Sequence, residues 1–459
     1  MKKILVSVAA ATMALSTTAS ALEDIKVSGQ AKLFYETTNA GKVGTEDKSL
    51  FDKDSSTGEV AFKIGMTGKQ GDVGFGATLY HTTTMGLEND VVQGVRTNTG
   101  LNDLALSGND NTYLGEIYIT APVAPDTVLK FGKQELDTPM AFTERWNAAP
   151  NTFNSAVAIN SSVENLTLIA AYVGQGNANQ PHYLTTTTPP TPLTASFASS
   201  ETFTSYYGTA FAVAALYKQD NFNANLWLYQ INNVLGNSTL TSPTNLNIGT
   251  EAGVTVNAAW FDAGMKLGDA NVKAVLAYAG HDDEGKPSTL SLTDGIKGDD
   301  TFGAALSADL KVSDITLFGA VSYVNEGDIP LANTATGFKK TMLPTQGIYT
   351  DGQYVAQPGS TAVKVSAATK LGDTALSLNA VHNMNSGNDN EVMGIQSKLA
   401  HELETTEIYA TVKQKVGAFD LMGIVMHRMM DDSVKDGNNK TTDDRQGGQI
   451  VRIVASVNF

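Results

Sequence analysis

A short polar segment, Gln134–Phe153, carries charged side chains of both signs between two stretches in which polar and apolar residues alternate. Its acids are Glu135, Asp137 and Glu144, and its base is Arg145. If such a segment narrows a passage for solutes, its width and charges select what passes, and opposed charges orient dipolar molecules. The same side chains could instead be solvated loop charges, some of them paired with neighbouring structure. The residues alone leave both interpretations open.

Side chains suited to catalysis are sparse in this chain. It has no Cys, which removes thiol nucleophiles, disulfides and Cys-ligated metals. Neither G-x-S-x-G nor H-E-x-x-H occurs. The six histidines fall in expected loops or at strand ends, where imidazoles are usually interfacial or solvated; they are His81, His182, His281, His382, His401 and His427. We therefore predict a protein that is not an enzyme.

The elements around the charged segment show the two-residue period of β-strands. In Asp24–Glu36 the odd positions are apolar or small, and polar residues stand between them. Similar runs recur in pairs joined by short Gly, Asp or Asn turns, such as Leu371-Gly372-Asp373 and Gln219-Asp220-Asn221. Short turns of this composition between alternating runs indicate β-hairpins. One further tight turn is expected at Ser161–Ser162.

Long polar segments separate these hairpins. They are Thr37–Gly58, Thr82–Asn111, Gln134–Phe153, Gly174–Gly208, Asn232–Glu251, His281–Asp299, Asn325–Gly359, Asn383–Glu402 and Met429–Gly447. Eight short turns and nine long loops imply eighteen antiparallel strands. An even strand number, with short turns at one end and long loops at the other, is typical of an outer-membrane β-barrel. We predict an all-β transmembrane barrel whose third long loop, Gln134–Phe153, folds inward, while Gly174–Gly208 and Asn325–Gly359 face outside.

The two ends of the chain fit this prediction. Residues 1–21 have a basic start, an apolar core and the small residues Ala19-Ser20-Ala21, as in a secretory signal peptide. We expect residues 22–459 to form a single barrel domain with both termini in the periplasm. At the other end, apolar residues alternate through Gln449–Phe459. A last strand that pairs with the first leaves no open edge, and Phe459 resembles the terminal aromatic signal that barrels present to their assembly machinery.

The net charge of the chain limits which kinds of partner it can bind. Without the basic start, 29 basic residues stand against 47 acidic ones, a formal charge of −18. Such a chain lacks the basic footprint that binds nucleic acid, and it favours cations in a pore or carries solvated acidic loops. Four acidic clusters are candidate calcium-binding sites: His281–Glu284, Asp299–Asp300, Asp431–Asp432 and Asp443–Asp444. None has the full calcium-loop spacing, so we expect no cofactor and no metal site. Loops that bridge to lipopolysaccharide through divalent ions are the favoured interpretation, and a specific loop-bound Ca²⁺ is the alternative.

Alternation also assigns charges to the inside of the barrel. A Lys or Arg that faces lipid at mid-bilayer costs about 2–4 kcal/mol, so charged strand residues are expected to point inward. The residues so placed are Lys26, Lys32, Lys63, Glu116, Lys130 and Arg452. We expect Lys32, Lys63, Lys130 and Arg452 to form a modest basic wall opposite the acidic loop.

The stretch around the charged segment resembles the OprD-type porins, including those of the Campylobacter group of bacteria. The matching features are LKFGKQ (Leu129–Gln134), Pro139, Arg145, Pro150-Asn151-Thr152-Phe153 and Asn165-Leu166-Thr167-Leu168. The resemblance implies an eighteen-stranded channel, usually a homotrimer, through which small hydrophilic solutes and ions diffuse without an energy source. One departure concerns selectivity: carboxylate-selective members line the pore with a ladder of arginines, whereas this chain has five, Arg96, Arg145, Arg428, Arg445 and Arg452.

These observations predict a porin of the outer membrane that is general or cation-leaning in ion transport. Two alternatives remain: a surface adhesin or antigen whose outer loops matter more than its pore, and a carboxylate- or amino-acid-selective channel.

Overall fold

A computed structural model describes residues 22–39, 49–84, 111–146, 148–176, 209–234, 254–281, 300–327, 329–336, 340–386, 401–435, 441–443 and 447–459. The expected signal peptide, residues 1–21, lies outside the described residues, and so does most of Gly174–Gly208. No helix in the described part of the chain is long and apolar enough to cross a membrane.

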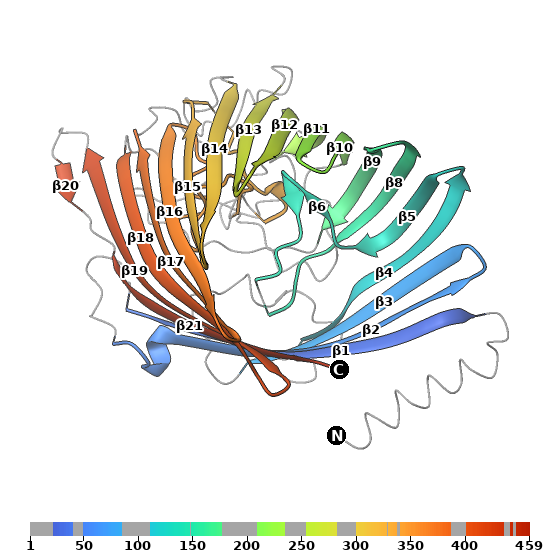
Figure 1. Cartoon of the computed structure of the whole chain (residues 1–459), viewed down its shortest axis with the longest axis horizontal. Coiled ribbons are helices and arrows are strands. Elements are labelled where there is room, and N and C mark those ends of the chain that lie inside the picture. Colours follow the sequence, from blue (N-terminus) through green and yellow to red (C-terminus); the bar gives the residue numbers. More distant parts are fainter. Residues whose placement is uncertain are drawn as a thin grey trace, which may run out of the picture.

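Eighteen long strands form the wall of a closed antiparallel β-barrel (Figure 1). They are β1 (Glu23–Thr38), β2 (Ser56–Gln70), β3 (Val73–Thr84), β4 (Asn111–Ala124), β5 (Thr127–Gln134), β8 (Phe153–Val163), β9 (Leu166–Gly176), β10 (Ala210–Lys218), β11 (Phe222–Val234), β12 (Val254–Leu267), β13 (Ala270–His281), β14 (Thr301–Val312), β15 (Ile315–Val324), β16 (Ser360–Leu371), β17 (Thr374–Asn385), β18 (His401–Val416), β19 (Phe419–Lys435) and β21 (Gly448–Asn458). The predicted fold class is confirmed.

Shorter elements accompany the wall. Strands β6 (Asp137–Thr138) and β7 (Ala141–Phe142) pair with each other inside the barrel, and β20 (Thr441–Asp443) extends the end of β19. Two 3₁₀ turns, Lys53–Ser55 and Thr334–Thr336, complete the described elements.

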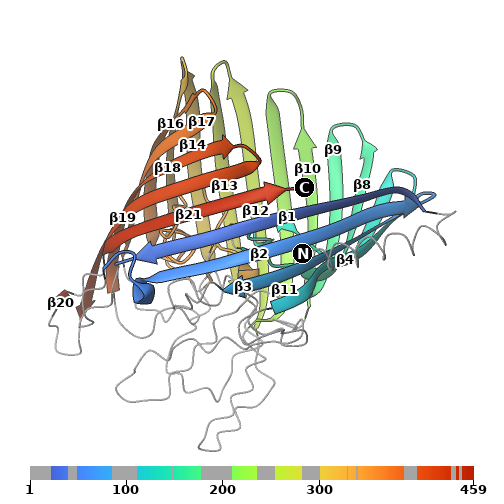
Figure 2. The ribbon, with the colours of Figure 1, turned by 90° about the horizontal axis from the view of Figure 1, so that it is seen from below.

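Each wall strand pairs with its neighbour along the chain, and β21 pairs with β1 to close the cylinder. Figure 2 shows these two strands side by side. Most of the short turns contain a residue with positive φ, such as Gly372 at 60° and Asn165 at 61°. Asn165 marks a small correction, because the turn expected at Ser161–Ser162 lies at Glu164 and Asn165, where an Asn side chain tolerates the left-handed backbone.

The two faces of the wall differ as alternation requires. In β14, buried and exposed residues alternate strictly from Thr301 to Ala308. The outer positions of the wall carry large apolar side chains, including Val27, Leu276, Leu306 and Val425, which are 50–60% exposed. So broad an apolar surface would promote aggregation in water, whereas it matches the hydrocarbon band of a bilayer.

Two long connections fold back inside the wall (Figure 1). Loop 135–152 joins β5 to β8, and loop 325–359 joins β15 to β16. Met140 of the first and Leu331 and Leu343 of the second are at most 2% exposed, and they pack against inward-facing side chains such as Trp227 and Trp260. The prediction that loop 325–359 faces outside is therefore wrong for its described residues. Its apolar side chains are buried more fully against the inner wall than they would be in outer solvent.

Candidate functional site

The centre of the inward-folded loop 135–152 is an ion-paired cluster. The Arg145 guanidinium donates from Nε to Glu135 Oε2 at 2.7 Å, and from Nη1 and Nη2 to the two Asp137 oxygens at 2.7 and 3.0 Å. The side chains of Asp137 and Arg145 are 65% and 50% exposed, so the cluster faces open lumen. The hydrogen bonds to Asp137 raise the pKa of Arg145, which therefore stays cationic. Two acids and one base leave the cluster with a formal charge of −1.

Glu144, the third predicted acid, has a different place. Its side chain is buried, and its carboxylate accepts from Trp146 Nε1 at 2.9 Å and from Asn333 Nδ2 at 3.1 Å. Asn333 belongs to loop 325–359 and also donates to the Phe142 carbonyl oxygen at 2.9 Å. Glu144 thus joins the two inner loops and does not present its charge to the lumen.

The wall near the cluster combines amines with tyrosine rings. Lys130 Nζ lies 3.8 Å from the Tyr118 ring centroid, and Lys63 Nζ lies 5.5 Å from that of Tyr80. Such contacts hold an ammonium group over the negative face of a ring. Glu116 accepts a hydrogen bond from Thr78 at 3.1 Å.

The same wall is electrostatically coupled to the loop. The Lys130 amine lies within electrostatic range of the carboxylates of Glu116 and Glu135. Lys32 donates to the Arg145 carbonyl oxygen at 3.2 Å. The structure therefore brings Lys32, Glu116 and Lys130 close to the loop cluster, with Lys63 on the neighbouring strand β2.

Arg452 points inward as expected, but it lies beneath the loops and is only 6% exposed. Its Nε donates to Glu36 Oε2 at 2.6 Å, and its guanidinium lies over the rings of Phe34, Trp146 and Tyr349 at 5.2, 5.5 and 5.4 Å. The ion pair and the rings shield this charge from the lumen. Lys26, near the other end of β1, is exposed.

Loop 325–359 is held by carboxylates that sequence analysis did not single out. Glu407 on β18 is fully buried and accepts three backbone N–H groups, from Ile348 at 2.7 Å, Tyr349 at 2.9 Å and Thr350 at 2.7 Å. The Tyr349 hydroxyl donates to Glu36. Within the loop, Lys340 donates to Asp351 at 2.8 Å.

Lys364 on β16 adds a further contact, with a 2.6 Å bond to the Gln346 carbonyl oxygen. One feature of the sequence could have predicted that this loop folds inward: apolar residues are scattered through an otherwise polar segment. Four of them, Ile329, Leu331, Leu343 and Val355, are at most 2% exposed.

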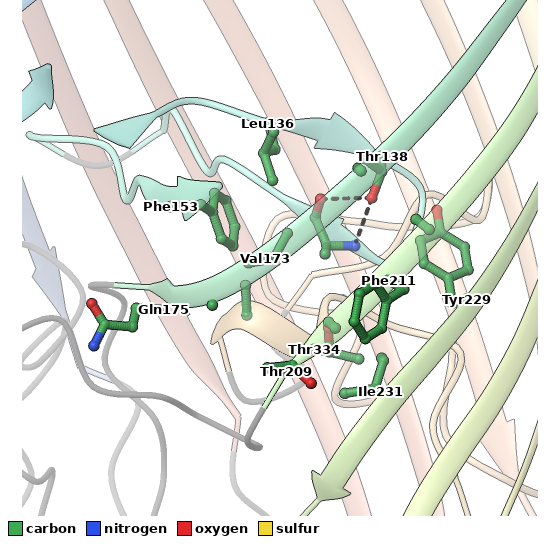
Figure 3. Close-up of a pocket in the computed structure, with 16 residues that line it drawn as sticks. Leu136, Thr138, Phe153, Val173, Gln175, Thr209, Phe211, Tyr229, Ile231 and Thr334 are labelled. Atoms are coloured by element: carbon green, nitrogen blue, oxygen red, sulfur yellow. Dashed lines mark hydrogen bonds between the residues drawn. The ribbon is translucent and has the colours of Figure 1, made fainter. Parts of the chain in front are cut away.

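An apolar pocket of about 60 Å³ separates loop 135–152 from the wall (Figure 3). Leu136 and Thr138 of the loop and Phe153, Val173, Phe211 and Ile231 of the wall line it. The Thr138 hydroxyl donates to the Ala141 carbonyl oxygen at 2.8 Å, so it is already bonded within the loop. The lining lacks convergent charged groups, which makes this space unsuited to a polar solute.

The four acidic clusters lie wholly or partly outside the residues whose side chains are described. Across the described residues, no three His, Asp or Glu side chains gather as a metal site would require. His81 Nδ1 lies 2.7 Å from Thr112 Oγ1, and His382 Nδ1 lies 2.9 Å from Thr406 Oγ1. His382 Nε2 lies 3.5 Å from Glu404 Oε1. Both histidines are on wall strands, His81 on β3 and His382 on β17.

Solved structures share this architecture at low sequence identity. Acinetobacter baumannii OccAB1 is 15% identical, with 96% of this chain and 98% of that chain covered and a TM-score of 0.63. The BenF-like porin of Pseudomonas fluorescens Pf-5 is 12% identical, with 95% and 99% covered and a TM-score of 0.62. Pseudomonas aeruginosa OccK2 (OpdF), solved in complex with glucuronate, is 14% identical, with 95% and 98% covered and a TM-score of 0.61.

No family model and no curated protein sequence matches the chain. The likeness to the Occ and BenF-like porins therefore concerns the eighteen-stranded fold.

Proposed function

We propose that this protein is a porin of the outer membrane, through which small hydrophilic solutes and ions diffuse passively. The observation that carries the proposal is the cluster of Glu135, Asp137 and Arg145, with Asp137 and Arg145 exposed, on a loop folded into the lumen of a closed barrel. An apolar outer surface and a charged inner passage are the requirements of a water-filled channel in a bilayer. The likeness to the Occ and BenF-like porins supports the same function.

The constriction, in this proposal, lies between the loop cluster and the wall formed by β2–β5. Glu135, Asp137 and Arg145 form its loop side, and Lys63, Glu116 and Lys130 form its wall side. Lys32 supports the loop through the Arg145 carbonyl. Glu144 and Arg452 act from buried positions and do not contact solutes.

The charges at this constriction balance, because Glu135, Asp137 and Glu116 stand against Arg145, Lys63 and Lys130. The balance supports a general channel, and the −1 of the loop side makes it lean toward cations where solutes pass closest to the loop. The glucuronate of the OccK2 structure belongs to that protein. Two of the five arginines, Arg145 and Arg452, already hold protein carboxylates.

The test is a reversal-potential measurement in planar bilayers under a KCl gradient. The double variant Glu135→Gln/Asp137→Asn changes the loop cluster from −1 to +1, so the potential should shift toward anion preference. Asp24→Asn is the matched control, because it removes one acid from an exposed ion pair at the far end of β1. A wild-type protein without conductance contradicts the channel. An unchanged potential in the double variant contradicts the cluster as the selective element.

We further propose a homotrimer with both termini in the periplasm, lipopolysaccharide around the outer rim, and recognition of Phe459 by the barrel-assembly machinery. The Phe459 ring supports the last point. It stacks on Phe62 with ring centroids 5.7 Å apart and is still 65% exposed, so most of the ring is accessible to a partner. The proposal also includes relatedness to the porins of the Campylobacter group. It further includes the absence of enzyme activity.

A further inference from the structure

Both inner loops meet the wall at the seam where the barrel closes. We define the seam junction as Phe34 and Glu36 of β1, Arg452 of β21, Trp146 of loop 135–152 and Tyr349 of loop 325–359. Strands β1 and β21 come from opposite ends of the chain, and Glu36 and Arg452 lie opposite each other in their register.

Arg452 is the one member of the seam junction that contacts all the others. Its Nε donates to Glu36 at 2.6 Å, and its Nη2 donates to the Tyr349 hydroxyl at 3.2 Å. The Trp146 indole lies beside Phe34, with ring centroids 6.3 Å apart, and both rings face the guanidinium. A planar group with five donors can pair and stack at the same time, which a lysine ammonium cannot do.

We propose that Arg452 is a positioning residue that fixes both inner loops to the closing strand pair, so that barrel closure and constriction of the pore form together. In an open sheet, β21 is not next to β1, and the guanidinium has no Glu36 to pair with. The tyrosine hydroxyl and the indole then lose their shared partner. The loops reach their final places once the seam has formed.

Other contacts of the loops support this one. Lys32 of β1 donates to the Arg145 carbonyl oxygen at 3.2 Å. Glu144 accepts from both Trp146 and Asn333, so it joins the two loops beside the seam junction. Glu407 holds backbone N–H groups of loop 325–359 on β18, which is separated from the seam by β19. Through Trp146 and Tyr349, Arg452 connects each loop to β21, the last strand of the chain.

The effect on conductance rests on the proposed channel function, so a second readout is independent of it. The chain has no Cys, and Leu343, in loop 325–359, is 2% exposed. A Leu343→Cys variant should therefore react slowly with a maleimide in the folded protein. Folding is checked by the gel shift between heated and unheated samples.

Arg452→Gln in this background should raise the single-channel conductance and accelerate labelling roughly tenfold, the factor that corresponds to about 1.4 kcal/mol. Arg452→Lys keeps the positive charge but loses the planar guanidinium. Its conductance and labelling rate should therefore resemble those of Arg452→Gln more than those of the wild type. The double variant Glu36→Gln/Arg452→Gln should destabilise the folded protein less than the sum of the two single variants. In the double variant neither partner is left as an unpaired buried charge. Lys69→Gln, which breaks the exposed pair with Asp24 on the same strand β1, is the matched control and should change nothing.

A folded Arg452→Gln variant with wild-type conductance and labelling overturns the proposal. If Arg452→Gln does not fold, Tyr349→Phe takes its place, since it removes only the hydroxyl that bonds both Glu36 and Arg452. Wild-type labelling in Tyr349→Phe then overturns the proposal. Absence of conductance in the wild-type protein refutes the channel alone, because the labelling experiment still tests the seam junction.

Discussion

The carboxylate of Glu407 offers the sharpest test of how loop 325–359 is held inside the barrel. Oε1 accepts the N–H of Ile348, and Oε2 accepts those of Tyr349 and Thr350. The side chain is fully buried, so water does not compete for these bonds. Substitution by Gln keeps one oxygen and places an NH₂ group against one of the three N–H donors. Substitution by Ala removes all three acceptor contacts.

The expected magnitudes follow from the number of bonds lost. A hydrogen bond to a charged group contributes about 1.5–3 kcal/mol. Glu407→Gln loses at least one and should destabilise the docked loop by roughly 2 kcal/mol, whereas Glu407→Ala loses three and should cost roughly 4.5 kcal/mol at the lower end of that range. With tenfold per 1.4 kcal/mol, the undocked population rises roughly thirtyfold for Gln and more than a thousandfold for Ala.

Single-channel recording distinguishes the states, because an undocked loop either widens the passage or produces open-channel noise. We expect the fraction of altered current to increase in the order wild type, Gln, Ala. Asp420→Asn is the matched control: it lies on the same β18–β19 hairpin, at an exposed pair with Lys415 of 4.0 Å. If Glu407→Ala folds and conducts as the wild type does, these three bonds do not position the loop and the reasoning is refuted.

Three further predictions test the pore and the wall. Arg145→Gln leaves its two acid partners uncompensated; a unit charge at roughly 8 Å in water contributes about 0.5 kcal/mol, favourable for a cation and unfavourable for an anion, so the cation-to-anion permeability ratio from reversal potentials should rise roughly fivefold, and a fall would contradict the placement of the cluster. Gly132→Ala should lower the free energy of unfolding in urea titrations by about 1–3 kcal/mol, because φ is +121° and a methyl group would meet a β4 carbonyl oxygen; Gly319→Ala, where a methyl group meets nothing within 4 Å, should leave the midpoint unchanged. Phe459→Ala removes a ring stack with Phe62 worth about 0.5–1.5 kcal/mol, so the folded fraction on unheated gels should decrease, and an undiminished yield would argue against a role of the terminal ring in assembly.

The wall of the barrel was predictable from the sequence because a bilayer imposes a strict local rule. Backbone groups must be paired between strands, and one face must be apolar, so every strand shows the two-residue period. In β14 this period is complete, and the turn at Gly372 carries the positive φ that its sequence indicates. Both features depend on residues adjacent in the chain. The strand number follows from them, whereas the inward fold of loop 135–152 was expected from its place as the third long loop of such a barrel.

The docking of loop 325–359 could not be predicted in the same way, because its contacts are distant in sequence and follow no period. Tyr349 and Glu36 are separated by 313 positions, and Asn333 and Glu144 by 189. A segment rich in Gly, Thr and Pro reads as an outer loop by composition. Whether the segment packs inside the barrel depends on contacts between its few apolar side chains and the inner wall. Trp227 and Trp260 provide such contacts here.

The same contacts change what the net charge of −16 implies for ions. Glu36, Glu144 and Glu407 are buried, and each already accepts hydrogen bonds from protein groups. Asp351 is buried against Lys340. Glu36 and Asp351 contribute little field in an aqueous passage, because Arg452 and Lys340 cancel their charges within a few ångströms. The hydrogen bonds of Glu144 to Trp146 and Asn333, and of Glu407 to backbone N–H groups, come from neutral donors and leave those charges in place. We expect ion preference to depend most on the lumen-facing charges near loop 135–152, where neutralising Glu135 and Asp137 changes the cluster from −1 to +1 while the charge of the whole chain changes only from −16 to −14.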